Sequence, residues 1–180
     1  MKTVVLLFHP NFEASRINKA FEQAIADDVN VRHMYELYPN NQVDVMTEQT
    51  TLTEADRIVL QFPMYWYNSP SLLKEWQDKV LTYGWAYGST GKALHGKELL
   101  LAVSTGAPNY THEAGMYTAT ELLRPFQAMA EFCGMTYLTP FVVKGTLTMS
   151  DEDVAKHAKH AKEYAEYLKQ ESIPALGKFD

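Results

Sequence analysis

The chain alternates between short, continuous apolar runs and longer segments in which apolar residues recur every three or four positions. Continuous runs rich in Val, Ile, Leu and Phe are typical of strands that a sheet buries on both faces. The run at residues 30–35 is less apolar, so we expect it at a sheet edge. The predicted strands are residues 3–8, 30–35, 57–62, 97–104 and 136–144.

The segments between these strands have the helical period, and several begin or end with residues that cap helices. Ser15, the pair Ser69–Pro70, and Ser150 with the acidic residues behind it are expected helix starts. Pro125 is expected to restart or kink the third helix, which ends before Gly134. The predicted helices run from Ser15 to about Ala26, from Ser69 to about Val80, from about Thr118 to Cys133 and from Ser150 to about Glu171, while residues 43–54 fit a short helix or an ordered loop.

Strands that alternate with helices predict an α/β protein with a parallel sheet covered by helices on both faces. We expect five strands in the flavodoxin-like order 2-1-3-4-5, in preference to a classical dinucleotide-binding fold. Ligands of such sheets bind outside the carboxyl ends of the strands, near the switch point. No linker, charge block or repeat divides the chain, so residues 1–180 are expected to form a single domain.

Composition and charge exclude several classes of protein. The single cysteine, Cys133, rules out a disulfide scaffold, and we expect it to be a small buried apolar residue. The formal net charge of −6 gives no basic surface for nucleic acid or an anionic membrane. The longest apolar runs have five residues, whereas a membrane span needs about 20. We therefore expect a cytoplasmic protein.

The segment after the first strand is a candidate phosphate site. It runs from His9 into the start of the first helix, where free amides and the helix dipole favour an anion. Ser15 and Asn18 can add hydrogen bonds, and Arg16 can add charge. Taken alone, the same residues also fit an ordinary capped helix, because Ser is a common cap.

Aromatic residues crowd the segment after the third strand, where Pro63 and Met64 precede Tyr65, Trp66 and Tyr67. A small satellite core is the alternative reading. Three successive aromatics with polar groups are unusual in a core, because hydroxyls and indole nitrogens need partners. The segment therefore predicts a wall on which a flat ligand stacks.

The segment after the fourth strand allows a ligand to approach the backbone closely, and it offers several hydrogen-bond donors. It begins with Ser104, Thr105 and Gly106, and Tyr110 and His112 follow. The two last residues are placed where a ring oxygen gains charge, although solvated loop residues are an equally good interpretation of each. These three loops meet at one edge of the predicted sheet.

Other motifs in the sequence are weaker indications of function than these three loops. The fingerprint G-x-G-x-x-G is absent, and the P-loop-like stretch 91–97 fails at Glu98, where Ser or Thr is required. His157 and His160 are three positions apart, but the lysines around them predict a solvated cationic face and no metal site. No hydrolase triad is evident. The long segment 81–96 has the length of a functional loop.

Taken together, the loop motifs resemble those of the flavodoxin-like NAD(P)H quinone oxidoreductases, and the resemblance covers about residues 1–167. It extends to the cytosolic ancillary subunits of glutathione-gated potassium/proton antiporters and to their general-stress relatives. The motifs that carry it are His9-Pro10 with Ser15 and Asn18, residues 61–67 with Ser69-Pro70, Gly84 to Gly88, Leu94 to Lys97, Ser104 to Gly106, Tyr35 to Pro39, and Glu48-Gln49.

The resemblance implies a non-covalent FMN, with FAD as the alternative, in a homodimer that uses NAD(P)H as co-substrate. In this chain it implies that residues 84–88 close the pocket from the partner subunit, and that Tyr110 and His112 are the catalytic pair. The relatives have two glycines where this chain has Gly106-Ala107, and His112 stands earlier than theirs. The cofactor-binding residues implied are His9, Ser15, Arg16 and Asn18 at the phosphate end, Pro63, Met64, Tyr65 and Trp66 beside the ring, and Ser104, Thr105 and Gly106 at its polar edge.

The activity implied is a two-electron, ping-pong transfer from NAD(P)H to a quinone or similar electrophile, with the flavin doing the redox chemistry. Tyr110 is then the expected donor to the quinone oxygen. Two other functions remain open. One is a regulatory subunit that docks on a membrane antiporter at the inner face of the membrane, and the other is an electron carrier like flavodoxin.

Overall fold

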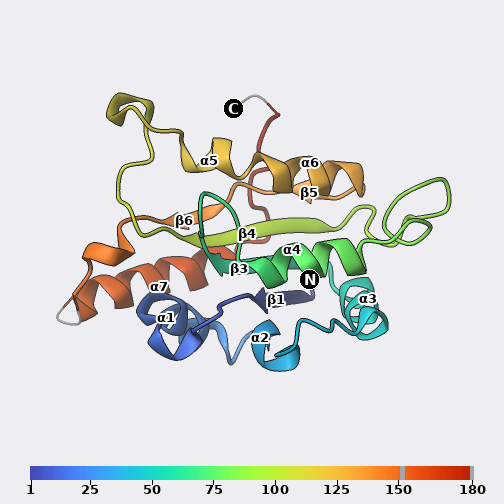
Figure 1. The fold of residues 1–180 in the computed structure, drawn as a ribbon, viewed down its shortest axis with the longest axis horizontal. Helices are drawn as coiled ribbons and strands as arrows, with labels where there is room; N and C mark the ends of the chain where they lie inside the picture. The colour runs from blue at the N-terminus through green and yellow to red at the C-terminus, as the bar shows by residue number, and fades with distance from the viewer. Residues whose placement is uncertain (151–152, 179–180) are drawn as a thin grey trace.

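The computed structural model describes residues 1–150 and 153–178. Its centre is a parallel sheet with the strand order β2-β1-β3-β4-β5, and β6 pairs with the far end of β4 (Figure 1). This confirms the predicted fold class and strand order. The strands are β1 (Thr3–Leu7), β2 (Asn30–His33), β3 (Arg57–Pro63), β4 (Glu98–Ser104), β5 (Thr136–Tyr137) and β6 (Phe141–Val143).

Seven α-helices and three short 3₁₀ turns are found in the part of the chain that the structure describes. The α-helices are α1 (Arg16–Ile25), α2 (Met34–Leu37), α3 (Val45–Glu54), α4 (Ser71–Val80), α5 (Ala119–Leu122), α6 (Arg124–Phe132) and α7 (Val154–Leu168). The 3₁₀ turns are η1 (Phe12–Ala14), η2 (His112–Ala114) and η3 (Thr146–Thr148). Ser15 is the N-cap of α1, as predicted, and its hydroxyl accepts a hydrogen bond from the Asn18 amide over 3.2 Å.

Some boundaries differ from the predictions. The fifth strand is divided into β5 and β6, with Pro140 in the gap, where its missing amide cannot join a ladder. The second strand ends at His33, because the buried side chain of Met34 starts α2. Helix α4 begins at Ser71, so Pro70 and not Ser69 is its N-cap. Helix α7 ends at Leu168, and the predicted acidic start at residues 151–152 lies outside the described residues.

Residues 43–54 are settled as the helix α3, whose N-cap Asp44 accepts a hydrogen bond from the Thr47 amide. The predicted helix 118–133 is divided at Leu123 into α5 and α6, with Pro125 in the first turn of α6. A proline is tolerated in that turn because its nitrogen needs no partner there. The restart predicted at Pro125 is therefore confirmed.

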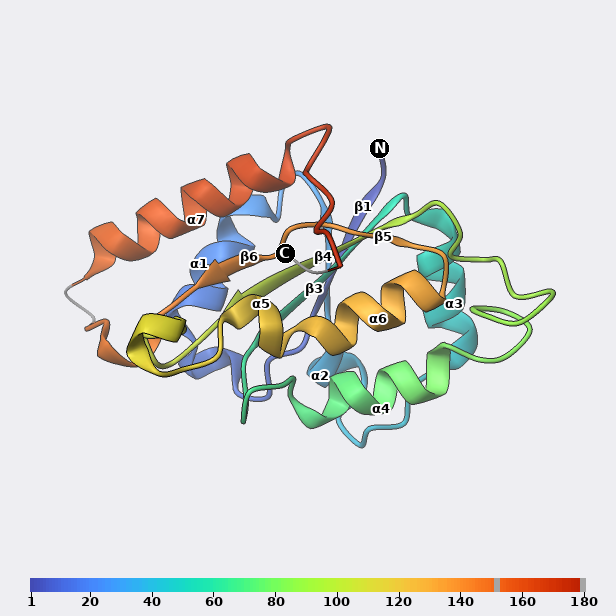
Figure 2. The ribbon, with the colours of Figure 1, turned by 90° about the horizontal axis from the view of Figure 1, so that it is seen from above.

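Helices cover both faces of the sheet (Figure 2). On one face α1 and α7 pack together, with the rings of Phe21 and Tyr164 4.6 Å apart. On the other face α3, α4 and α6 pack, and the ring of Trp76 meets that of Phe8 edge-on. Burial on both faces explains why the central strands are apolar throughout.

A buried carboxylate joins three elements on the second face. Glu48 of α3 is fully buried and forms an ion pair with Arg32 of β2. Its carboxylate also accepts hydrogen bonds from the Tyr38 hydroxyl over 2.6 Å and from the Trp76 indole nitrogen over 3.0 Å. Such a charge is tolerated only because it is paired and hydrogen-bonded.

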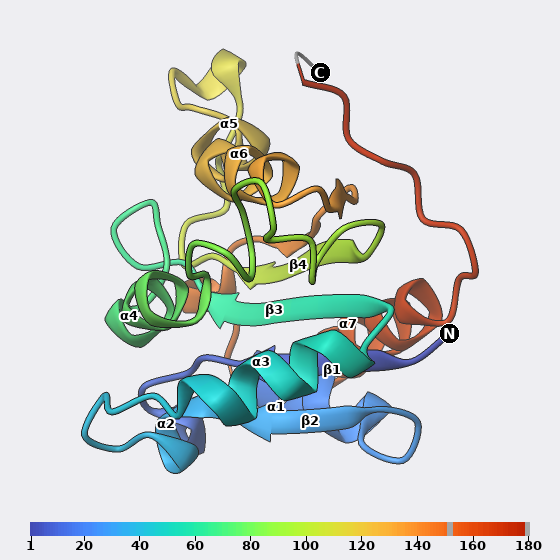
Figure 3. The ribbon, with the colours of Figure 1, turned by 90° about the vertical axis from the view of Figure 1, so that its right-hand side faces the viewer.

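The chain ends beside the sheet edge. After α7 it returns along β5 towards α6, where Thr139 N donates to the Pro174 carbonyl over 2.8 Å (Figure 3). The segments after β1, β3 and β4 all leave from the carboxyl edge of the sheet, whereas residues 81–97 lie at the opposite edge (Figure 1). In the described ranges, none of the helices has the length and apolarity that a bilayer crossing demands.

Candidate functional site

Buried polar side chains connect the elements beneath the carboxyl edge. Asn18 of α1 is 1% exposed and donates from Nδ2 to Ser15 Oγ over 3.2 Å and to Ser104 Oγ over 3.1 Å. Gln61 of β3 donates to Asn18 Oδ1 over 3.3 Å and accepts from the Tyr164 hydroxyl over 3.1 Å. Satisfied networks of this kind rigidify what they join. The rim of the sheet is therefore fixed before any ligand arrives.

A cavity of about 340 Å³ opens above this network. Most of the predicted cofactor residues line it, from all three loops: His9, Ser15, Arg16, Asn18, Pro63, Tyr65 and Ser104. Sequence analysis missed part of the lining, which comes from the segment after β6 and from α7: Thr146, Leu147, Met149 and His157. The place of the first three was predictable in principle, because they also follow the carboxyl end of a strand.

The phosphate-like end of this cavity combines neutral donors with one fixed cation. Burial lowers the pKa of the His9 imidazole to about 4, so this ring is neutral at pH 7. Its Nδ1 accepts from the Asn11 amide over 3.2 Å, which leaves the proton on Nε2 as a donor. Arg16 donates to the Met149 carbonyl and so ties α1 to the segment after η3. The start of α1 adds the positive end of the helix dipole.

The segment after β3 is a tight aromatic turn. Tyr65 and Asn68 exchange two backbone hydrogen bonds of 2.9 and 3.0 Å, with Trp66 and Tyr67 between them. Both central residues have positive φ, 49° and 62°, which costs a non-glycine residue roughly 1–3 kcal/mol. Trp66 is 93% exposed, so packing does not offset that cost. A strained turn that presents a bare aromatic ring is typical of a binding platform.

The aromatic turn is anchored to the third loop, because Met64 N donates to the Ser104 carbonyl over 2.8 Å. The Thr105 amide donates to the Val143 carbonyl over 2.8 Å, so it extends the β4–β6 ladder. The structure describes no partner for the amides of Gly106 and Ala107. A Cβ at Gly106 would come within 2.6 Å of the side chain of Leu147, which is exposed and would have to move to make room.

The predicted catalytic pair does not line the first cavity. Tyr110 and His112 line a second cavity, of about 480 Å³, on the other side of the loop after β4. Burial and the neighbouring Tyr67 raise the pKa of Tyr110. His112 is exposed, and its Nε2 lies 2.8 Å from Glu121 Oε2. The structure thus brings Tyr110 beside the aromatic turn, whereas His112 faces Glu121.

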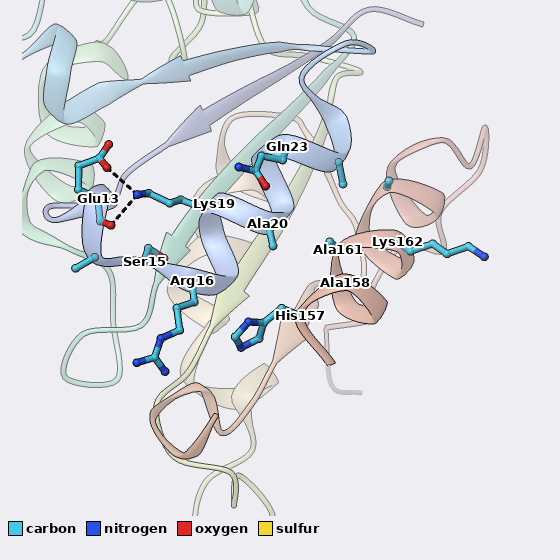
Figure 4. Close-up of a pocket in the computed structure, with 13 residues that line it drawn as sticks. Glu13, Ser15, Arg16, Lys19, Ala20, Gln23, His157, Ala158, Ala161 and Lys162 are labelled. Carbon is cyan, nitrogen blue, oxygen red and sulfur yellow. Dashed lines mark hydrogen bonds and ion pairs between the residues drawn. The ribbon is translucent and has the colours of Figure 1, made fainter. Parts of the chain in front are cut away.

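A wider groove of about 980 Å³ separates α1 from α7 and adjoins the first cavity (Figure 4). Arg16 and His157 point towards the same end of it, so His157 lines two cavities and does not lie on the solvated face that we predicted. Lys19 is held by Glu13 over 2.7 Å. His160 lies 3.1 Å from Glu163, and across the described chain no set of His, Cys, Asp and Glu could hold a metal. Cys133 is buried, as predicted.

The face of α4 and α6 carries a cleft of about 490 Å³, to which Lys74, Gln77 and Asp78 of α4 contribute polar groups. Tyr87, from the long segment 81–97, lines this cleft together with Met129 and Phe132 of α6. Phe132 is 69% exposed although its ring packs 5.1 Å from that of Tyr87.

A search against protein families gives one match. The family described as having a flavodoxin-like fold matches residues 1–168. The chain belongs to this family. The predicted membership among flavodoxin-like NAD(P)H oxidoreductases is confirmed by curated relatives with that name. One, described as the uncharacterized NAD(P)H oxidoreductase YrkL of Bacillus subtilis, is 49% identical over 176 residues, which cover 95% of this chain and 99% of the relative.

Two further curated relatives carry other names. General stress protein 14 of Bacillus subtilis is 50% identical over 175 residues, which cover 94% of this chain and 98% of that protein. The glutathione-regulated potassium-efflux system ancillary protein KefF of an Enterobacter species is 40% identical over 159 residues, or 87% and 90% of the two chains. The chain is therefore a flavodoxin-like relative of both.

Solved structures of similar proteins agree with the fold. The general stress protein 14 of Treponema denticola, solved in complex with FMN, has a TM-score of 0.87 and 40% identity and covers 93% of this chain and 98% of its own. An NADPH-quinone reductase of P. pentosaceus has a TM-score of 0.74 and 34% identity over 92% and 98%. A chain described as a thermophilic tryptophan halogenase from Streptomycin violaceusniger, whose name indicates another activity, has a TM-score of 0.87 and 46% identity over 94% and 99%.

Proposed function

We propose that the protein is a flavin-dependent NAD(P)H:quinone oxidoreductase. The single observation that carries this proposal is the convergence of three loops on one cavity. That cavity is lined by the start of α1 at Ser15, by Tyr65 of the exposed aromatic turn and by Ser104 at the end of β4, whereas Trp66 and Gly106 lie in the same loops outside its lining. This set of donors and surfaces suits the three parts of a flavin nucleotide, which are a phosphate, a flat ring and the polar edge of that ring.

The residues present fit FMN, which the related protein of Treponema denticola binds. His9, Ser15, Arg16 and Asn18 would hold the phosphate end, because they supply neutral donors, a cation and the first amides of α1. Pro63, Met64, Tyr65 and Trp66 would flank the ring, and Ser104, Thr105 and Gly106 its polar edge. FAD is the alternative, and the adjoining groove between α1 and α7 has room for its adenosine part.

When bound, the flavin supplies the two-electron chemistry between NAD(P)H and a quinone-like acceptor. The chain's own part is to bind, orient and stabilise charge. One stacking site beside the flavin ring would serve the two substrates in turn, so the expected kinetics are ping-pong. The amides of Gly106 and Ala107 are available for negative charge at the ring edge, in the manner of an oxyanion hole. Tyr110 and His112 are the proposed donors to the acceptor oxygen.

The active form in this proposal is a homodimer. Residues 84–88 lie at the opposite edge of the sheet from the cavity, so within one chain they cannot close it (Figure 1). A second copy packed on the α4–α6 cleft in the reverse direction would bring its own residues 84–88 to the cavity. The exposed Phe132 and the aromatic residues of that segment give this face its apolar character.

The purified protein tests the proposal directly. We expect a yellow preparation whose released flavin has the mass of FMN, or of FAD if the groove is used. Initial rates at several quinone concentrations should give parallel double-reciprocal lines against NAD(P)H. A colourless protein that takes up neither flavin would reject the proposal.

A second candidate function rests on the 40% identity to KefF, which is named as an ancillary protein of a potassium-efflux system. In that role the protein would be cytoplasmic and would dock on a membrane antiporter. The two roles are compatible, since an oxidoreductase can report redox state to a partner. Retention of the protein by antiporter-containing membranes, compared with membranes that lack the antiporter, separates the roles.

A further inference from the structure

The second cavity, on the other side of the loop after β4, reaches the aromatic turn of the candidate cofactor site through Tyr110. Lys144, which lines it, follows Val143, whose carbonyl accepts the Thr105 amide. Tyr110 lines it as well and lies beside Tyr67 of the aromatic turn. A molecule that stacks on the aromatic turn can therefore continue past Tyr110 into this cavity.

The charge of the cavity comes from Lys144. Lys144 directly follows β6, and it lines the cavity together with Val142 of that strand. Lys144 is exposed and forms no ion pair with any residue in the described ranges. An ammonium group that faces a cavity without a partner is a natural site for an anion.

Neutral groups complete the cavity. Thr120 lines it, and its hydroxyl has no hydrogen-bond partner among the residues that the structure describes. The hydroxyl of Thr118, by contrast, is engaged by Glu121 over 2.9 Å. Pro140 and Val142 add apolar surface. The volume of about 480 Å³ is far larger than a phosphate needs and falls in the usual range of sites for small organic ligands.

One acidic side chain opposes this charge. Glu113 lines the cavity and is exposed, and hydrogen bonds from its own amide and from Thr111 lower the pKa of its carboxyl. It therefore stays ionised at neutral pH and weakens the attraction for an anion. Removal of the Glu113 charge should therefore strengthen the binding of an anion, which makes this residue useful in a test.

We propose that this cavity binds the adenosine end of the nucleotide co-substrate through its 2′-phosphate, and so favours NADPH over NADH. The proposal rests on the proposed function, because the nicotinamide end must lie against the flavin ring, beside the aromatic turn. A phosphomonoester carries a charge of about −1.5 to −2 at pH 7, which suits the ammonium of Lys144 and the hydroxyl of Thr120. Pro140 and Val142 provide the apolar surface against which a base can pack.

Calorimetry on the purified protein with its bound flavin tests the site without turnover. The probes are adenosine 2′,5′-bisphosphate, AMP and inorganic phosphate. We expect the bisphosphate to bind at least about tenfold more tightly than AMP, and inorganic phosphate to compete only weakly. Lys144→Gln should abolish the difference between bisphosphate and AMP, and Glu113→Gln should increase it. Lys169→Gln is the matched control, because Lys169 pairs with Asp28 far from the cavity.

Steady-state kinetics supply the second readout. In Lys144→Gln the ratio of kcat/KM for NADPH to that for NADH should fall at least about tenfold, and in Lys169→Gln it should not change. Equal binding of bisphosphate and AMP by the unmodified protein, or an unchanged preference in Lys144→Gln, overturns the site. If inorganic phosphate competes as strongly as the bisphosphate binds, the assignment of the cavity to a nucleotide is overturned. Binding that depends on Lys144 in a protein without NAD(P)H oxidation would refute the proposed function and keep the site.

Discussion

Asn18 Nδ2 donates a hydrogen bond to Ser104 Oγ over 3.1 Å, and this bond joins the first turn of α1 to the end of β4. The same amide nitrogen reaches the cap residue Ser15. Because Gln61 of β3 also donates to Asn18, one buried amide sets the relative positions of all three loops around the cavity. The geometry of the candidate cofactor site therefore depends on Asn18 even where a ligand does not touch it.

Replacement of Asn18 by Ala should weaken flavin binding and the fold together. It leaves buried partners unsatisfied, which costs roughly 1–3 kcal/mol in the free energy of unfolding. We expect the flavin dissociation constant to rise at least about tenfold, since about 1.4 kcal/mol corresponds to tenfold. Quenching of flavin fluorescence and urea denaturation measure the two effects. Asn30→Ala, at an exposed position of β2, should change neither.

Replacement of Trp66 should separate strain from function. Trp66→Gly and Trp66→Ala both remove the exposed ring, but only glycine adopts a positive φ without cost. The glycine variant should therefore be more stable than the alanine variant by about 1 kcal/mol. Both should lose quinone turnover, by about fivefold if one stacking contact is lost. Equal stabilities of the two variants, measured by urea denaturation, would mean that the turn is not strained.

His9 predicts a pH dependence of stability. Its pKa is about 4 in the fold and about 6.5 in the unfolded chain, so the unfolded chain binds more protons between these values. The free energy of unfolding of the flavin-free protein should therefore fall as pH decreases from about 6.5 to 4. Glu121 and Asp153, whose pKa values are about 2, contribute losses at lower pH.

The variant His9→Gln isolates this contribution, because glutamine does not titrate. Its stability should change less steeply with pH across the same window, as followed by urea denaturation in steps of half a pH unit. A variant with the slope of the unmodified protein would show that His9 titrates normally in the fold.

The proposed catalytic pair is tested by the double variant Tyr110→Phe with His112→Ala. If these side chains donate to the acceptor, quinone turnover should fall at least about tenfold at unchanged flavin content, within the usual range for proton donors. Tyr117→Phe, at an exposed position of the same loop, is the control. Unchanged turnover in the double variant would leave charge stabilisation to the main-chain amides of Gly106 and Ala107.

The sequence predicted a parallel sheet covered on both faces because the central strands are apolar throughout. It did not predict that α2 starts at Met34, because burial of that side chain depends on distant packing. The buried charge of Glu48 was equally invisible, since its partners come from β2, α2 and α4.

The sequence predicted those parts of the candidate site whose positions are determined by the ends of the strands. The loops that begin at His9, Pro63 and Ser104 line one cavity because parallel strands end at the same edge. Leu147 and His157 were missed because the path of the chain after β6 is not written in a spacing or a period. Tyr110 and His112 line a second cavity, because the path of the loop after β4 is likewise not encoded in a spacing or a period.

A crystal structure of the protein with FMN is the most direct test of the central claim, that three loops at one edge of the sheet bind a flavin. The account predicts the phosphate at the first turn of α1 near Ser15, and the ring between the aromatic turn at Tyr65 and the glycine approach at Gly106. A ring bound at any other place, or a cavity that stays empty at saturating FMN, would contradict it.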